Sequence, residues 1–216
     1  MKLQQTNILT IGNNMKSSST PVKMLDEGII RESIEYYYQI ALKTCREAKK
    51  WYSEEFHATA RHCYDIDPTF SVLHWCGVIS ALSPNTNWQK NKEFALLLAT
   101  LTNKSIIDAE QLYASGIRCL FRLNLLESSI LKVLNGAKTS HFFLNGAYPH
   151  LETGATLDSH MGQIMCPEIK GSTSFTKTSY HVAKEIFCRI AREKGMLSHE
   201  LQAMVWCAKV HKNKRN

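Results

Sequence analysis

The chain has 216 residues, a length that fits one domain and suffices to bury a core. Apolar residues make up 44% and charged residues 21%, which excludes a disordered or fibrous chain. Apolar runs are short, as in 95–99, whereas a transmembrane helix needs roughly 20 apolar residues, so we expect none. The formal net charge of +7 permits nucleic-acid binding through phosphate neutralisation but does not require it.

Seven cysteines are spread along the chain, and no two of them form a CxxC pair. This spacing favours free thiols in a reducing compartment, because zinc and iron–sulfur sites need clustered ligands. We therefore expect no metal and no cofactor. The first residues lack a basic segment followed by an apolar stretch. We expect no secretory signal and a cytoplasmic location, which for a viral protein means the host-cell cytoplasm.

Residues 1–22 are predicted to form a flexible leader, because Asn, Ser, Thr and Pro are frequent in its second half. A helical pattern begins after Asp26, a predicted N-cap, with Ile30, Ile34 and further apolar residues at three- and four-residue steps. It continues to about residue 63 as one long helix or two short ones. Pro68 then prevents the helix from continuing.

The remaining predicted helices follow in close succession. A buried helix spans 70–82, a polar turn spans 83–87, and a helix over 88–101 directs Trp88, Phe94, Leu97 and Leu98 inward. Further helices are predicted at 105–115, 125–134, 137–147, 158–165, 180–191 and 199–210, with a loop at 166–173. No alternating run typical of a strand is present. We predict an all-α fold of about eight to ten helices, with residues 23–216 forming a single domain.

Three polar stretches carry the candidate chemistry, namely 82–88, 134–139 and 156–160. In the second, the Gly136 turn feeds a helix N-terminus whose backbone N–H groups and dipole can bind a phosphate. Lys138 lies in the first turn of that helix, where the dipole disfavours a cation and so favours a nucleophilic amine. Asp158 of the third stretch is interpreted either as a plain N-cap or as an acid that stabilises a developing cation or activates a nucleophile.

The order of these stretches resembles the helix-hairpin-helix superfamily of DNA glycosylases, the endonuclease III-like group. In that family a hairpin L-P-G-V-G-x-K-T precedes a helix, and V-D-T-H or V-D-R-H follows; here Lys138 and Asp158 are 20 positions apart. The resemblance implies that Gly136 is the second hairpin glycine, Lys138 the Schiff-base nucleophile of bifunctional members and Asp158 the catalytic aspartate. His160 matches the histidine after that aspartate. The resemblance also implies two helical lobes with the site between them.

The segment Leu82-Ser83-Pro84-Asn85 is similar to the family's L-S-x-Q segment, whose polar residue fills the gap left by a flipped base. The resemblance gives this part to Asn85. Ser83, Asn135 and Thr139 belong to the matching segments and are candidate DNA contacts. The sequence departs from the family at Leu134, which stands where the first hairpin glycine belongs, and it lacks the C-terminal iron–sulfur cysteines.

The segments A-L-S-P-x-x-x-W-x-x-N (81–91) and L-N-G-x-K-T (134–139), together with 200–206, are similar to a divergent, largely phage-encoded branch. That branch is related to the α-glutamyl/putrescinyl thymine pyrophosphorylase clade, which is associated with thymine hypermodification in viral DNA. Trp88, Asn91 and Gln202 lie in these segments and complete the predicted DNA-binding residues. Trp88 is alternatively a core residue, and Gln202 alternatively bonds the backbone.

The resemblance implies a DNA glycosylase that flips a modified or damaged base out of double-stranded DNA and excises it. Two alternatives stay open. One is a transferase that displaces pyrophosphate from a modified thymine in viral DNA, and the other is a non-catalytic DNA-binding module on the same scaffold. The oligomeric state also stays open. The basic tail 209–215 is interpreted either as a solvated terminus or as a phosphate contact.

Overall fold

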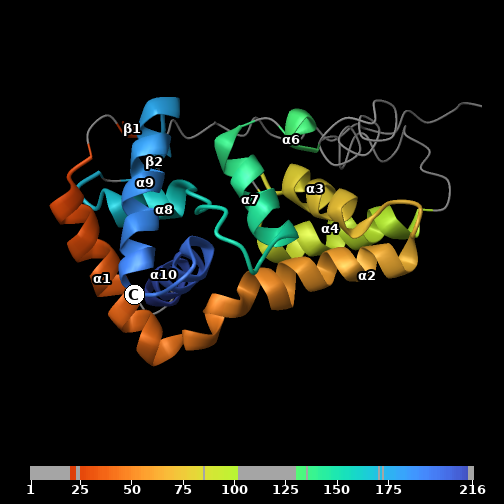
Figure 1. Cartoon of the computed structure of the whole chain (residues 1–216), viewed down its shortest axis with the longest axis horizontal. Helices are drawn as coiled ribbons and strands as arrows, with labels where there is room; N and C mark the ends of the chain where they lie inside the picture. The colour runs from red at the N-terminus through yellow and green to blue at the C-terminus, as the bar shows by residue number, and fades with distance from the viewer. Residues whose placement is uncertain are drawn as a thin grey trace, which may run out of the picture.

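The chain folds mainly into helices, which confirms the predicted all-α class (Figure 1). The computed structural model describes residues 20–22, 25–84, 86–101, 130–134, 136–169, 171 and 173–213. These residues form nine α-helices, a 3₁₀ segment, a π segment and two short strands. Within the same ranges, no helix combines the length and the hydropathy that crossing a membrane requires.

The helical run after Asp26 is bent rather than straight. Helix α1 (Glu27–Thr44) begins at Asp26, whose carboxylate accepts the N–H groups of Gly28 and Ile29, as predicted for an N-cap. Cys45 leaves the helical conformation at φ −153°. The chain then continues through the 3₁₀ segment η1 (Arg46–Lys50), the π segment η2 (Tyr52–His57) and α2 (Ala58–Ile66). Figure 1 shows this run crossing the lower edge of the molecule from α1 to α2.

Four helices follow on the α2 side of the molecule: α3 (Val72–Leu82), α4 (Trp88–Thr100), α6 (Ile130–Val133) and α7 (Ala137–Ala147). The prediction of a helix at 137–147 is confirmed at the same bounds. The predicted helix at 105–115 lies outside the described residues, as does the first half of the one at 125–134, whose second half contains α6. The prediction that Leu97 faces inward is wrong, because it is 43% exposed while its neighbour Leu98 is buried.

The last part of the chain forms α8 (Ser159–Met165), α9 (Lys177–Glu193) and α10 (Ser198–Asn213). Helix α9 begins three residues before the predicted start. Thr176 and Ser179 form a reciprocal capping box there, each side chain accepting the other residue's backbone N–H. The bounds of α8 and α10 were predicted within a few residues, because apolar periodicity can be recognised within a single segment of the sequence.

The end of the predicted leader is not part of a loose segment. Thr20–Val22 forms strand β1, which pairs in parallel with β2 (Thr173–Phe175), and the side chain of Val22 is fully buried. Sequence analysis predicted no strand at either place. Three residues are too few to show an alternating pattern, and the two strands lie about 150 positions apart in the chain.

Buried side chains gather in two hydrophobic cores. The first core lies among α1, α8, α9 and α10, and the second among η2, α2, α3, α4 and α7. Helix α10 serves both, because Leu201 and Met204 belong to the first core and Ala203 to the second. Figure 1 shows α7 at the side of the second group that faces α8 and α9. The segment between α7 and α8 therefore runs along the junction of the cores.

Candidate functional site

A buried hydrogen-bond network, the junction network, joins the two cores. The Tyr52 hydroxyl of η2 donates to Oε1 of Gln202 on α10 at 2.8 Å, and it lies 3.2 Å from Oγ1 of Thr156. All three side chains are at most 7% exposed. Buried polar groups of this kind cost free energy unless they are paired, so the three residues fix one another's positions.

Asn145 of α7 extends this network. In the amide orientation that pairs both of its polar atoms, Nδ2 donates to Thr153 Oγ1 at 2.6 Å and to the Gly154 carbonyl at 2.9 Å. In that orientation Oδ1 accepts from Thr156 Oγ1 at 3.0 Å. The side chain is fully buried. The junction network therefore consists of Tyr52, Asn145, Thr153, Thr156 and Gln202, and it holds the 153–156 segment against α7.

Asp158 follows this segment and begins α8. Its Oδ1 accepts the Met161 backbone N–H at 2.8 Å, so the interpretation as an N-cap is confirmed. Burial raises the pKa of the Tyr52 and Tyr180 phenols well above the usual value, and the Asp158 carboxylate raises each of them further. The half-buried carboxylate therefore lies close enough to act electrostatically on a phenol from each side of the junction.

Tyr180 and His141 connect the first turns of α7 to the segment before Asp158. The Tyr180 hydroxyl lies 3.3 Å from the Leu157 N–H and 3.2 Å from the Ala155 carbonyl. It also lies 3.5 Å from Nδ1 of His141, which contacts the Ala137 carbonyl at 2.8 Å. Burial lowers the pKa of His141, so the ring is neutral and Nδ1–H donates to Ala137. Tyr180 of α9 therefore bridges the second turn of α7 and residues 155–157.

Gly154 allows this close approach. It has φ +92°, a conformation that favours glycine, and a Cβ atom there would lie 3.0 Å from the His141 ring. A larger residue would crowd the His141 ring and the Lys184 side chain. Both the positive φ and the nearby His141 ring therefore favour glycine at position 154.

Gly136 sets the start of α7. Its φ of +107° and ψ of 141° fall in a region that is essentially restricted to glycine. Glycine offers no side chain as a cap, so the N–H groups of the first turn, Ala137, Lys138 and Thr139, have no intrahelical acceptor. Lys138 is half-buried and lies three residues before His141, on the same side of the helix. The predicted nucleophile therefore lies one helical turn before the histidine that contacts Tyr180.

The predicted DNA-binding residues of the first stretch have structural partners. Asn91 is 2% exposed and donates to the Ile79 carbonyl at 3.1 Å, so it ties α4 to α3 and its amide is not accessible to DNA. Ser83 ends α3 and donates to the Ser80 carbonyl at 2.9 Å. Asn85 lies outside the described residues.

Trp88 belongs to an aromatic cluster at the edge of the second core. Its ring lies 4.7 Å from that of Trp51 and stacks on Phe56 at 6.0 Å, measured between centroids. Its Nε1 donates to Glu55 at 3.3 Å. The side chain is half-buried. Trp88 therefore packs against the core, as its core interpretation predicts, and leaves part of its ring at the surface.

The remaining predicted residues fall at different places. His160 is exposed on α8 and packs its ring edge-on against Trp206 at 6.0 Å. Gln202 is buried in the junction network rather than at the surface. Thr139 is half-buried in the first turn of α7. Asn135 lies outside the described residues. The structure therefore places Gln202 in the junction network, Asp158 directly after residues 153–156, and Lys138 in the first turn of α7. Asn91 lies on α4 and Ser83 at the end of α3.

Sequence reasoning missed Tyr52, Asn145, Tyr180 and His141. Tyr52 opens the π segment η2, a helix type that is rare and is frequently found at functional sites. Neither the π segment nor the pairing of Tyr52 with Gln202, 150 positions away, leaves a pattern in the sequence. Thr156 was part of a stretch that the sequence did single out, because it precedes Asp158 by two residues.

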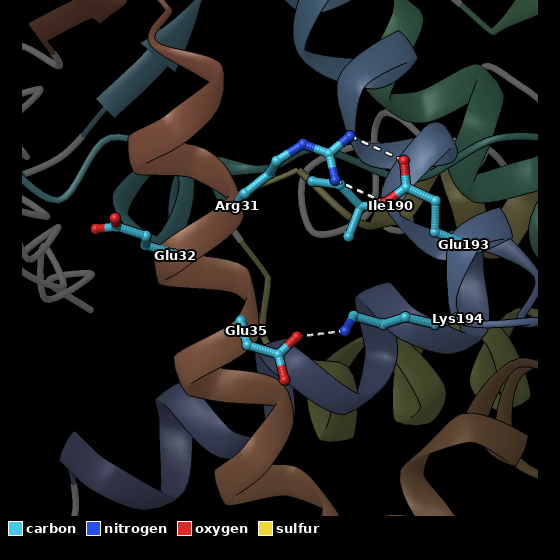
Figure 2. Close-up of a pocket in the computed structure, with 6 residues that line it drawn as sticks. All are labelled: Arg31, Glu32, Glu35, Ile190, Glu193 and Lys194. Carbon is cyan, nitrogen blue, oxygen red and sulfur yellow. Dashed lines mark hydrogen bonds and ion pairs between the residues drawn. The ribbon is translucent and has the colours of Figure 1, made fainter.

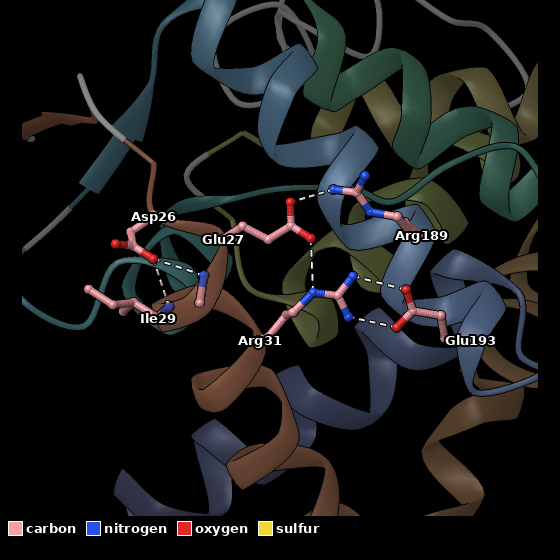
Figure 3. A network of polar contacts seen from close by, with 7 residues as sticks. Asp26, Glu27, Ile29, Arg31, Arg189 and Glu193 are labelled. Carbon is pink, nitrogen blue, oxygen red and sulfur yellow. Dashed lines mark hydrogen bonds and ion pairs between the residues drawn. The ribbon is translucent and has the colours of Figure 1, made fainter.

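A second polar cluster lies between α1 and α9 (Figure 3). Arg31 donates to both oxygens of Glu193, at 2.6 and 2.9 Å, and to Glu27 at 2.9 Å. Arg189 donates to the other oxygen of Glu27 at 2.5 Å, and Lys194 pairs with Glu35. Beside this cluster lies a hollow of about 510 Å³, which is lined by Arg31, Glu32, Glu35, Ile190, Glu193 and Lys194. Figure 2 shows Glu32 pointing away from α9. Three cations face three carboxylates here, so the cluster is electrically neutral and joins two helices.

Neither a metal-binding cluster nor a characterised relative identifies the site. Among the described residues, no group of three or more His, Cys, Asp and Glu side chains is placed to hold a metal ion. No curated protein and no solved structure matches the chain significantly. A family model described as a family of unknown function (DUF7178) matches residues 15–214. The match covers most of the sequence, and the chain therefore belongs to the DUF7178 family.

Proposed function

We propose that this chain is a DNA base-processing enzyme that excises a modified or damaged base from duplex DNA. The observation that carries the proposal is the junction of the cores, where the segment that leads into α8 lies beside α7. Tyr180 of α9 bridges His141, one turn after Lys138 on α7, and residues 155 and 157, and Asp158 follows directly as the N-cap of α8. The motif order that resembles helix-hairpin-helix glycosylases falls on these same residues.

Two further features support the proposal. The start of α7 presents backbone N–H groups and the positive end of a helix dipole, which favours an anion such as a DNA phosphate. The half-buried Asp158 carboxylate lies among largely buried groups, where its charge acts more strongly than it does in water. In base excision, the helix start would hold a backbone phosphate of the DNA, and the carboxylate would act at C1′ of the sugar.

In the proposed reaction, the enzyme first rotates the target nucleotide out of the stack, at a cost of a few kcal/mol that backbone contacts offset. The bond between C1′ of the sugar and the base then breaks, and its electron pair leaves with the base. Asp158 stabilises the positive charge that develops on the sugar, or takes the proton of the attacking water. Water adds to C1′, and the products are the free base and an abasic site.

Lys138 supplies a second route. Its amine attacks C1′ in place of water, the base departs with the electron pair of the broken bond, and ring opening leaves a Schiff base between Lys138 and the sugar. Loss of a proton from the neighbouring sugar carbon then expels the 3′ phosphate and cleaves the strand. This route predicts a covalent intermediate that borohydride reduces to a stable adduct, whereas direct hydrolysis by water predicts none.

The test is incubation of the full chain with duplex oligonucleotides that each carry one modified or damaged base, followed by mass spectrometry of the bases and nucleosides. We expect a free base from at least one duplex. Asp158→Asn should abolish the release while keeping the fold, because asparagine caps helices as well as aspartate does. Lys138→Gln should remove any borohydride adduct, whereas Lys177→Gln, an exposed lysine on α9, should leave it intact.

The outcomes separate the three hypotheses. Release of a base that persists in Asp158→Asn would remove the proposed role of Asp158. A nucleoside of higher mass, without a free base, would favour the transferase alternative. DNA binding that survives Asp158→Asn and Lys138→Gln together, with no chemical change in any duplex, would favour the non-catalytic module and contradict the proposal.

A further inference from the structure

Helix α1 has two charged flanks that differ in how their cations are paired. On the flank that faces α9, the cations Arg31, Arg189 and Lys194 all bond to carboxylates (Figures 2 and 3). Their charges cancel, and a distant anion is attracted only weakly. The opposite flank, which faces the C-terminal half of α10, is built differently.

On that flank, lysines bond to tyrosines. Nζ of Lys212 donates to the Tyr36 hydroxyl at 3.0 Å and lies 4.9 Å from the centre of its ring. Nζ of Lys209 donates to the Tyr37 hydroxyl at 3.4 Å and lies 5.6 Å from that ring. A cation over an aromatic face is attracted by the ring quadrupole. The two helices run antiparallel here, because the later lysine contacts the earlier tyrosine.

A neutral partner positions a cation without cancelling its charge. Among the described residues, neither Lys209 nor Lys212 forms an ion pair with a carboxylate. The bond to Tyr36 raises the pKa of Lys212, so this lysine stays charged. A freely rotating lysine loses rotamer entropy when it binds an anion, and lysines already held on rings lose less of it.

The basic surface extends along α1. Lys43 lies two helical turns after Tyr36 on the same side of the helix, and it is exposed. Tyr36 itself is 49% exposed, so part of an aromatic ring lies among these positive charges. In the other direction, Glu32 lies one turn before Tyr36 and ends the basic stretch. We call the surface formed by Tyr36, Tyr37, Lys43, Lys209 and Lys212 the α1–α10 seam.

We propose that the α1–α10 seam binds the phosphate backbone of DNA. Three lysines with no carboxylate partner in the described part of the chain fit a polyanion, and the half-exposed ring of Tyr36 fits a nucleic acid better than a lipid headgroup, because bases and sugars stack on aromatic faces. The choice of DNA rests on the proposed function. The seam contains neither Lys138 nor Asp158, so it supplies affinity and no catalytic group.

The test measures duplex DNA binding by the full chain over a range of salt concentrations, for wild type and Lys209→Gln/Lys212→Gln. We expect the double variant to bind on the order of tenfold more weakly at 0.1 M salt, with the slope of log affinity against log salt reduced by about 1.8, which is two lost phosphate contacts. Lys209→Arg/Lys212→Arg keeps the charge and should keep the slope. The matched control is Lys177→Gln/Arg192→Gln, which removes the same charge from exposed positions on α9.

Each result has one meaning. An equal loss in the seam variant and in the α9 control would show general attraction to a basic protein and would overturn the proposal. Unchanged DNA binding in the seam variant would also overturn it, and binding to phosphatidylserine vesicles that the variant loses would assign the seam to a membrane instead. Base release is measured separately. Seam-dependent DNA binding without base release contradicts only the proposed function, and base release with unchanged affinity contradicts only the seam.

Discussion

The hydroxyl of Tyr52 lies 2.8 Å from Oε1 of Gln202, and this bond joins the second hydrophobic core to a helix of the first. Tyr52 stands at the start of the π segment where the chain passes from one core to the other. Gln202 is one of the buried polar residues of α10, between Leu201 of the first core and Ala203 of the second. The relative position of the two cores is therefore fixed by a directional bond as well as by apolar packing.

Removal of the Tyr52 hydroxyl tests this bond. Tyr52→Phe keeps the ring in place and leaves Gln202 and Thr156 each short of a buried partner, so we expect a loss of about 1–3 kcal/mol in the free energy of unfolding. Urea unfolding followed by circular dichroism measures it. Tyr64→Phe, at an exposed tyrosine of α2, is the control and should change the free energy by less than about 0.5 kcal/mol. Similar values for both variants would mean that the bond contributes nothing to stability.

Gly146→Ala distinguishes packing from helix propensity. Glycine inside a helix costs roughly 0.5–1 kcal/mol relative to alanine, so propensity alone predicts that the variant is more stable. A Cβ atom at this position, however, would lie 2.1 Å from the ring of the fully buried Phe56. Because Phe142 and Trp88 surround that ring, we expect a net loss of about 1–3 kcal/mol in unfolding free energy. Ser140→Ala, at a half-buried position of the same helix, controls for propensity, and a stabilised Gly146→Ala protein would contradict the contact.

Stability should fall as the pH drops below about 6.5, the ordinary pKa of histidine. Burial lowers the pKa values of His199 and His141, so both are neutral in the folded chain and titrate at higher pH in the unfolded chain. Between the two pKa values the unfolded state binds more protons, and the free energy of unfolding therefore decreases as the pH falls. Unfolding in urea at pH 7.5 and 5.5 measures the decrease.

His199→Gln should reduce this pH dependence, because the ring whose Nε2 bonds the Pro149 carbonyl is then absent. His62→Gln, at an exposed histidine, is the control and should leave the decrease unchanged. The carboxylates of Glu35 and Glu193 titrate in a separate window: bonds to Lys194 and Arg31 lower their pKa values, so their contribution is lost only at more acidic pH. A flat stability between pH 7.5 and 5.5 in the wild type would contradict buried neutral histidines.

Arg31→Gln removes the central cation of the α1–α9 cluster. The groups are solvent-exposed, so we expect a small decrease in melting temperature that is largest at low salt. The difference from wild type should shrink as salt rises, because the screening length falls from about 10 Å at 0.1 M to about 3 Å at 1 M. Arg61→Gln, at an exposed arginine of α2, serves as the control for loss of one positive charge. A difference that does not depend on salt would point to packing of the Arg31 side chain rather than to its charge.

The sequence by itself determined most helices of the described chain and the start of several. The 137–147 helix was predicted at its observed bounds, Asp26 was predicted to be an N-cap, and an N-cap was one of the two interpretations of Asp158. These features are local: apolar periodicity and a capping side chain act within a few residues, and so they can be read without knowing the fold.

The tertiary structure alone decided which polar side chains face the interior. Asn91 and Gln202 are polar residues that the sequence does not mark as buried. Each is buried with a hydrogen-bond partner: Asn91 donates to the Ile79 carbonyl, and Gln202 accepts from Tyr52. The pairing of Thr20–Val22 with Thr173–Phe175 is equally invisible locally. Contacts between positions far apart in the chain depend on how helices pack, and no pattern within a single segment encodes that packing.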